Sequence, residues 1–93
     1  MSDSPVAERS VPIVNSAGLH ARPAAQLVKL ASRFACDVQI AKDDLNVNAK
    51  SIMGVLMLAA EKGSHIHIRC EGDDADQALE ELAALVARGF EET

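Results

Sequence analysis

The sequence predicts a small two-layer α+β domain with the element order β-α-β-β-α-β-α. Three observations predict this class. The chain has 93 residues, which is enough for one domain. Its apolar residues switch repeatedly between a period of two and a helical period. The segments between these runs are short and rich in Gly, Asn, Asp and Ser, as turns are.

The first predicted strand covers residues 10–14, where Val11, Ile13 and Val14 supply β-branched side chains. Pro12 cannot donate a hydrogen bond to a neighbouring strand, so this strand is expected at a sheet edge or at a bulge. The polar residues 1–9 are interpreted as a flexible N-terminal extension, and residues 10–93 as a single domain.

A helix is expected from Ala21 to Ala35, because apolar residues recur at helical spacing along one stripe. Pro23 falls in its first turn, where a missing N–H costs nothing. The stripe comprises Ala24, Leu27, Val28, Ala31 and Phe34.

The middle of the chain predicts a hairpin followed by a short apolar helix. The runs around Val38–Ile40 and Leu45–Val47 alternate and are separated by residues 42–44. A helix is then expected over residues 52–60, with Ser51 as its N-cap because a serine hydroxyl can accept from an N–H of the next turn.

The last strand and helix follow from residue 65 onward. In residues 65–70 the side chains of Ile66, Ile68 and Cys70 should face inward, and those of His65, His67 and Arg69 outward. Acidic residues 73–76 open the final helix, where the helix dipole favours them. Its buried stripe is Leu79, Leu82, Val86 and Phe90.

Composition excludes several classes of protein. The 9 basic and 14 acidic residues give a net charge of −5, which argues against a duplex-binding protein. With Phe34 and Phe90 as its aromatics, the chain lacks a platform for stacking bases. The two cysteines do not define a disulfide scaffold. No signal peptide or membrane span is recognisable, which predicts a cytoplasmic protein that contacts no membrane.

The segment Gly18-Leu19-His20-Ala21-Arg22-Pro23-Ala24 is the first candidate site. His20 falls between a glycine turn and a helix start, where unpaired N–H groups and the dipole favour an anion. A neutral ring nitrogen there is a potential nucleophile, and Arg22 offers a guanidinium fork suited to phosphate. No acid, metal set or second nucleophile is near in sequence, so the site could hold a group but lacks the parts of a hydrolase.

This segment and a second one, Asn48-Ala49-Lys50-Ser51-Ile52-Met53-Gly54, resemble the two motifs of HPr, the histidine phosphocarrier family of the bacterial phosphoenolpyruvate-dependent phosphotransferase system. The resemblance covers residues 10–90. It implies an open-faced β-sandwich, in which three helices cover one face of a four-stranded antiparallel sheet.

The resemblance also implies a function. The protein would be a stoichiometric carrier without a cofactor, not an enzyme by itself. His20 would match the phosphorylated histidine, modified on Nδ1, and Arg22 the active-site arginine. The phosphoryl group would come from enzyme I and pass to an EIIA component, and so serve sugar transport. We expect a monomer, because docking to several partners requires an open surface.

Ser51 would match the family's regulatory serine, the target of an HPr kinase/phosphorylase. A phosphoserine at a helix N-terminus is tolerated locally, so its effect would fall on docking. Ile52, Met53 and Val55 are the residues expected in an exposed apolar docking patch. Met53 and Met57, at helical spacing, are interpreted as core and docking surface.

Two alternatives stay open. The nine-residue extension suggests a nitrogen-branch (NPr-type) regulatory carrier that is not coupled to sugar uptake, whereas the intact His20 argues against a Crh-type paralogue, which lacks this histidine. His65 and His67 point the same way and could bind zinc or copper. No carboxylate or cysteine is near them in sequence, so a solvated sheet face is favoured and no metal ligand is assigned.

Overall fold

The computed structural model describes residues 4–92, and within that range four strands form one antiparallel sheet in the order β1-β4-β2-β3. The strands are β1 (Val6–Pro12), β2 (Asp37–Lys42), β3 (Leu45–Asn48) and β4 (His65–Glu71). The helices are α1 (Ala21–Ala31), α2 (Ile52–Met57) and α3 (Ala75–Ala87), and a 3-10 turn, η1 (Gly89–Glu91), follows α3. The predicted fold class and element order are confirmed.

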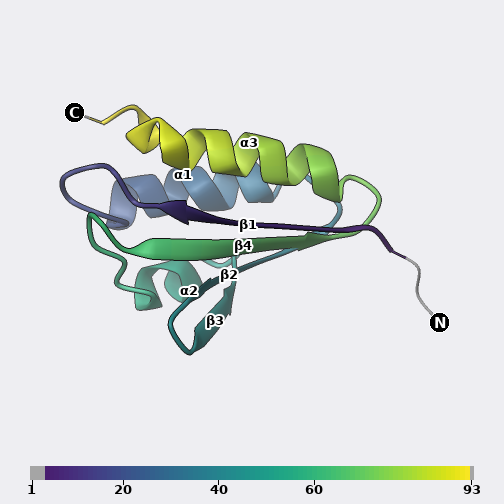
Figure 1. Cartoon of the computed structure of the whole chain (residues 1–93), viewed down its shortest axis with the longest axis horizontal. Helices are drawn as coiled ribbons and strands as arrows, with labels where there is room; N and C mark the ends of the chain where they lie inside the picture. Colours follow the sequence, from purple (N-terminus) through teal and green to yellow (C-terminus); the bar gives the residue numbers. More distant parts are fainter. Residues whose placement is uncertain (1–3, 93) are drawn as a thin grey trace.

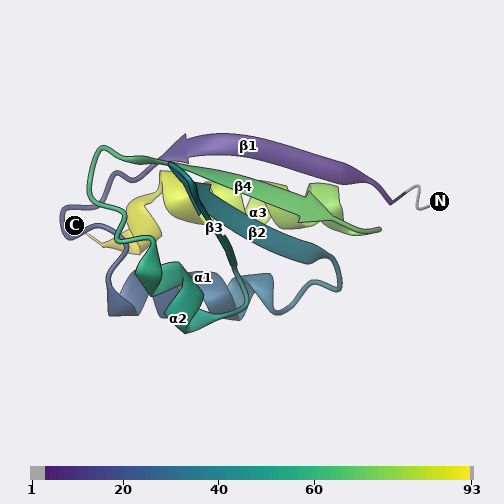
Figure 2. The same ribbon diagram turned by 90° about the horizontal axis from the view of Figure 1, so that it is seen from below.

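The sheet and the helices form two layers with the core between them. α3 packs against β1 and β4, while α1 contacts both α3 and α2 (Figure 1). Figure 2 shows β1 at one edge of the sheet, with β4 beside it and β2 beyond β4. Burial alternates along β4 as the sequence predicts, with Ile66, Ile68 and Cys70 in the core. The largest fully buried side chains include Phe90, Ile13, Leu27, Ile40 and Leu82.

Local chemistry explains two predicted features. Pro12 is the last residue of an edge strand, where its missing N–H leaves no partner unsatisfied. β2 and β3 form the expected hairpin, in which Lys42 pairs with Leu45 across Asp43 and Asp44. Asp43 has a φ of 54°, a conformation that aspartate tolerates in turns.

The boundary of the first strand is a correction. β1 begins at Val6 rather than at Ser10 and ends at Pro12 rather than at Val14, so residues 6–9 pair with β4 instead of belonging to an extension. Their sequence concealed this, because Arg9 occupies an inward-alternating position between the buried Ala7 and Val11. At the sheet edge its guanidinium reaches Glu80 on α3, with 3.0 Å between nitrogen and oxygen. The prediction for residues 1–3 lies outside the described residues.

Two helices are shorter than predicted. α1 ends at Ala31 rather than Ala35, and residues 32–35 form the turn into β2. α2 ends at Met57 rather than Ala60, because Ala59 adopts a left-handed φ of 48° that stops the helix. Phe90, predicted at the end of the last helical stripe, is fully buried but lies in η1.

Cys36 and Cys70 are free and buried, which confirms their interpretation as core residues. Burial raises the pKa of the Cys36 thiol to about 12, and hydrogen bonding to the Asp74 carboxylate acts in the same direction. Both effects keep the thiol protonated and unreactive near neutral pH.

Candidate functional site

A tight loop places His20 at the start of α1. Asn15 and Gly18 close this loop through a bond from the Gly18 N–H to the Asn15 carbonyl, and the Leu19 N–H donates to the Ala60 carbonyl. Gly18 has a φ of 71°, and a Cβ added there would lie 2.5 Å from the Ala60 carbonyl oxygen. No other residue fits this close approach without a shift of backbone.

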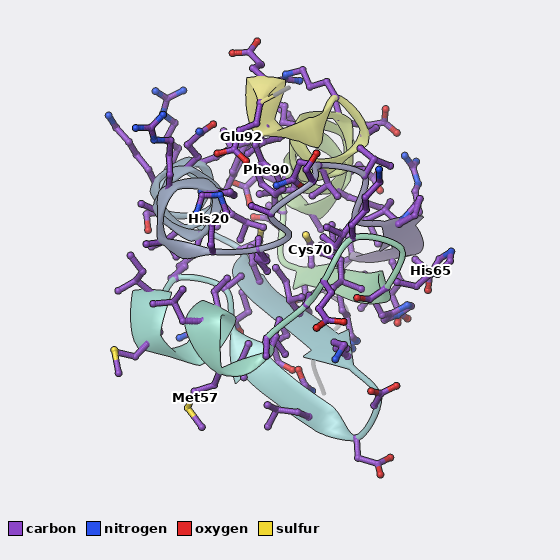
Figure 3. The ribbon with its side chains drawn as sticks, turned by 90° about the vertical axis from the view of Figure 1, so that its left-hand side faces the viewer. His20, Met57, His65, Cys70, Phe90 and Glu92 are labelled. Atoms are coloured by element: carbon purple, nitrogen blue, oxygen red, sulfur yellow. The ribbon has the colours of Figure 1, made fainter. Side chains whose placement is uncertain are left out.

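His20 is the N-cap residue of α1, but its side chain does not cap the helix. Its ring is 43% exposed and turns instead toward the C-terminal segment, where Nε2 lies 3.2 Å from Oε1 of Glu92 (Figure 3). Nothing in the sequence around His20 predicts this partner, which is 72 positions away.

Glu92 is held in place by a second side chain. The Asn15 amide donates to Oε1 of Glu92 at 3.0 Å and to the Gly18 carbonyl at 2.8 Å. The hydrogen bond with His20 lowers the pKa of the Glu92 carboxyl, and the Asn15 amide and the charges of His20 and Arg22 act in the same direction. Glu92 is therefore a carboxylate at neutral pH.

The first turn of α1 is open to an anion. Among the described residues, neither the Ala21 N–H nor the Arg22 N–H has a backbone acceptor, and Pro23 has no N–H. The Arg22 side chain is exposed and makes no hydrogen bond or ion pair with any residue from 4 to 92. Unpaired N–H groups, the positive end of a helix dipole and a guanidinium without a hydrogen-bonded partner together suit a doubly negative anion.

These groups share one open cleft with a volume of about 470 Å³. It lies between the loop before α1, the first turn of that helix and the C-terminal segment. Its lining residues are Ser16, Ala17, His20, Arg22, Glu91 and Glu92. The two residues predicted from the sequence, His20 and Arg22, therefore do come together, and two carboxylates that were missed lie beside them.

The second motif forms the start of α2. Ser51 is its N-cap, and the Ser51 hydroxyl accepts from the Gly54 N–H at 3.2 Å, as predicted. Ile52 and Met53 are exposed by 40% and 68%. Val55 is wrong as a docking residue, because its side chain is fully buried against the core. Met57, with 64% exposure, extends the surface at the same end of the molecule as His20 (Figure 3).

The other two histidines lie on the open face of the sheet. The side chain of His65 has no hydrogen bond or ion pair within the described chain. His67 is bonded at both nitrogens, with Nε2 2.7 Å from Oε1 of Glu8 and Nδ1 3.0 Å from Oγ of Ser10. The fold thus brings a carboxylate to His67 that was not visible in its neighbouring sequence. Within residues 4–92, no group of three or more His, Cys, Asp or Glu residues is arranged to hold a metal ion.

An exposed histidine beside a free arginine, at an unpaired helix N-terminus, defines a site that can carry a charged group on a ring nitrogen. Comparison with known proteins gives this class of carrier its family. A family model described as "PTS HPr component phosphorylation site" matches residues 7–88. The phosphocarrier protein HPr of Treponema pallidum is 45% identical over 84 residues, which are 90% of this chain and 96% of that protein.

Solved structures agree with these matches. The structure of HPr from Bacillus anthracis has a TM-score of 0.84 and 51% identity, and the match covers 87% of this chain and 96% of that one. HPr-C-His from Thermoanaerobacter tengcongensis has a TM-score of 0.90 and 41% identity, with 94% and 98% covered. The chain belongs to the HPr family of phosphocarrier proteins of the phosphotransferase system, which are carriers rather than catalysts. No helix within residues 4–92 is long and apolar enough to cross a membrane.

Proposed function

We propose that His20 is the residue of this phosphocarrier that accepts the phosphoryl group from enzyme I and passes it to an EIIA component. The observation that carries the proposal is the position of His20. Of the three histidines in the chain, it alone stands at a helix N-terminus whose first N–H groups are unpaired within the described residues. A phosphoryl group on the ring would meet these donors.

The other histidines are poorer acceptors of the group. His67 already uses both ring nitrogens in contacts with Glu8 and Ser10. His65 is exposed on the open face of the sheet, with no helix N-terminus beside it. The sheet face supplies no set of aligned N–H donors, because strand dipoles largely cancel.

Arg22 supplies the charge that a phosphoryl group needs. Its guanidinium is exposed, lines the same cleft as His20 and forms no hydrogen bond or ion pair with a carboxylate in the described part of the chain, although its charge acts on Glu92. A planar guanidinium binds a phosphate through two parallel hydrogen bonds. Binding must stay moderate, since a carrier that holds the group too tightly cannot pass it on.

Partners would dock on the exposed apolar side chains of α2, which are Ile52, Met53 and Met57. Figure 3 shows Met57 on the face of the molecule that also carries His20. Exposed methionines adapt to partners of different shape, as a carrier between enzyme I and EIIA requires. Val55 has no part in this surface. We propose a monomer, because this form leaves the docking surface open to partners. We place the protein in the cytoplasm, as its family implies.

The proposal is tested by intact mass after incubation with enzyme I and phosphoenolpyruvate. We expect one acid-labile phosphoryl group on the wild type and on His65→Ala, and none on His20→Ala. His65→Ala is the matched control because it removes an exposed imidazole that lies outside the cleft. A labelled His20→Ala variant would disprove the assignment.

Ser51 is the proposed regulatory site. Its hydroxyl lies next to Ile52 and Met53, so a phosphate there would add about two negative charges to the docking surface. We expect HPr kinase with ATP to label the wild type and Ser32→Ala, which loses another exposed serine at a helix end, but not Ser51→Ala. Equal labelling of all three proteins would exclude Ser51.

The branch of the system is also a proposal. The nitrogen-branch alternative was based on a nine-residue extension, and residues 6–9 belong to β1 instead. We therefore favour the sugar branch. The phosphorylated protein should discharge to a sugar-specific EIIA faster than to a nitrogen-type EIIA. The opposite order would reverse this choice.

A further inference from the structure

The contact between His20 and Glu92 bears on which ring nitrogen reacts. We propose that Glu92 is a positioning residue that keeps the imidazole proton of His20 on Nε2 and leaves Nδ1 as the nitrogen that takes the phosphoryl group. This inference rests on the proposed function of His20 and adds a role for a residue near the end of the chain.

The tautomer follows from the chemistry of the pair. Nε2 of His20 lies 3.2 Å from Oε1 of Glu92, within hydrogen-bond distance. An ionised carboxylate can only accept, so Nε2 must donate its proton in this contact. A neutral imidazole has one N–H, so Nδ1 then carries the lone pair, as a nucleophile requires.

The carboxylate is itself fixed by the fold. Nδ2 of Asn15 donates to Oε1 of Glu92 and to the Gly18 carbonyl, two acceptors that determine which way the amide faces. Asn15 is buried, so it joins the loop before α1 firmly to the C-terminal segment. Glu92 is only 19% exposed, although it follows the last turn of the chain.

The backbone before Glu92 also directs its side chain to the cleft. Gly89, Phe90 and Glu91 have φ values of 65°, 56° and 61°, which turn the chain back toward α1. The fully buried ring of Phe90 anchors this turn, and the Glu92 N–H donates to the Gly89 carbonyl at 2.9 Å. Figure 3 shows Glu92 and Phe90 above His20, in the segment that follows α3.

The phosphoryl group can be transferred to His20 and away again while the ring proton stays on Nε2. The Nδ1 lone pair forms the new bond to phosphorus, the bond between phosphorus and the donor breaks, and the donor keeps that electron pair. The His20 ring becomes a phosphorylated imidazolium, whose positive charge faces the Glu92 carboxylate. When the group is passed on, the ring leaves as a neutral imidazole with its proton still on Nε2. A carboxylate that orients a histidine and compensates its charge acts in the same way in hydrolytic triads.

Glu91 provides a matched control. It lines the same cleft and carries the same charge, but its carboxylate lies 3.6 Å from Nε of Arg88 and not against His20. Replacing Glu91 changes the charge of the cleft without removing the acceptor of the His20 proton. Any effect of the electrostatic field alone should appear in both variants.

The test is ¹⁵N NMR of the imidazole tautomers at a pH where the rings are neutral, with His65 as an internal reference for an unrestrained ring. In the wild type and in Glu91→Ala, we expect His20 to show a larger Nε2–H fraction than His65. In Glu92→Ala, the His20 fraction should fall to that of His65. Glu92→Gln should keep the wild-type tautomer, because the amide oxygen can still accept between Asn15 and His20.

Glu92 is proposed both to orient the His20 ring and to compensate its positive charge. Transfer rates measured in a single turnover at saturating enzyme I separate these two effects. We expect Glu92→Ala to be phosphorylated about two- to fivefold more slowly than the wild type, with an unchanged dependence on enzyme I concentration. Glu92→Gln should be intermediate, because it orients the ring but supplies no charge. A purely structural role of Glu92 would lower thermal stability without changing the tautomer.

The outcomes distinguish this proposal from the one on which it rests. A wild type that is phosphorylated on His20, combined with equal tautomers and rates in the wild type and Glu92→Ala, overturns the role of Glu92 and leaves the carrier function intact. Phosphorylation on Nε2 instead of Nδ1 also overturns it. A wild type without any label on His20 overturns the carrier assignment, and the reaction step proposed for Glu92 fails with it.

Discussion

The starts of α1 and α2 place different side chains at equivalent positions. Ser51 caps α2, because its hydroxyl accepts from the Gly54 N–H. His20 occupies the same position on α1 but makes no such bond, and the N–H groups of Ala21 and Arg22 have no backbone acceptor in the described chain. The start of α2 is closed by its serine cap, and the start of α1 is left open. An open helix start is one that can receive an anion.

The difference has a cost that the surrounding fold offsets. An uncapped helix start lacks about 1 kcal/mol of stabilisation relative to a capped one. α1 compensates through burial of Pro23, Ala24, Leu27 and Ala31, whereas the six-residue α2 has one fully buried residue, Val55. The long helix can therefore leave its N-terminus free for chemistry, while the short helix depends on its cap.

The largest predicted effect concerns the loop that holds the open helix start. Gly18→Ala should destabilise the protein by about 2–4 kcal/mol, because its Cβ would clash with the Ala60 carbonyl at a left-handed φ. Urea unfolding measures this loss. The control is Gly63→Ala, where φ is also positive but the Cβ would meet open space, and about 1 kcal/mol is expected. Equal losses in both variants would mean that the close approach to Ala60 is unimportant.

The next effect tests whether the open start uses Arg22. Arg22→Ala should slow phosphorylation by enzyme I about 10- to 100-fold, the range of a lost hydrogen bond to a charged group. Its unfolding free energy should stay within about 0.5 kcal/mol of the wild type, since the side chain is exposed and unpaired in the described residues. Lys29→Ala, which removes an exposed cation further along α1, is the control for net charge. Loss of stability rather than of rate would contradict the assignment.

The closed start should respond in the opposite way. Ser51→Ala should cost about 1 kcal/mol of stability because the Gly54 N–H loses its acceptor, while transfer through His20 stays at the wild-type rate. His20→Ala should abolish transfer and cost less than Ser51→Ala, because the imidazole caps nothing. Chemical denaturation and intact mass on the same samples compare the two. If His20→Ala were less stable than Ser51→Ala, the contrast between an uncapped α1 and a capped α2 would be wrong.

Fold and site were predictable to different degrees, for physical reasons. His20, Arg22 and Ser51 stand in local patterns that set a helix start, so short stretches of sequence locate them. Glu92 and Asn15 meet His20 across the whole chain, and nothing local distinguishes Glu92 from Glu91. Periodicity on a six-residue helix does not reveal which apolar residues are buried, so Val55 was assigned to the surface, and the Met53–Met57 pair was divided between core and docking surface although both side chains are exposed.

The start of α3 gives the smallest predicted effect. Asp74 is its N-cap residue, but its carboxylate accepts from the Ala35 and Cys36 N–H groups, both at 2.9 Å, instead of capping α3. The bond from Ala35 is the largest of several that lower the pKa of Asp74, so its contribution to stability is present above the unfolded pKa of about 3.9 and is lost as pH falls through the lower folded value.

Asp74→Asn should therefore be less stable than the wild type at pH 7. This difference in stability, the gap, should become smaller as pH falls below about 4. Thermal unfolding across that range measures the gap. Asp73→Asn, an exposed neighbour without these bonds, should follow the wild type. A gap that stays constant with pH would show that the charge of Asp74 contributes nothing.

The open start of α1 is tested most directly by amide NMR of the protein before and after phosphorylation with enzyme I and phosphoenolpyruvate. If the phosphoryl group on His20 meets the unpaired donors, the amide protons of Ala21 and Arg22 shift strongly downfield, and that of Gly54, already bonded to Ser51, does not move. Phosphorylation that leaves the Ala21 and Arg22 amides unchanged would contradict the account.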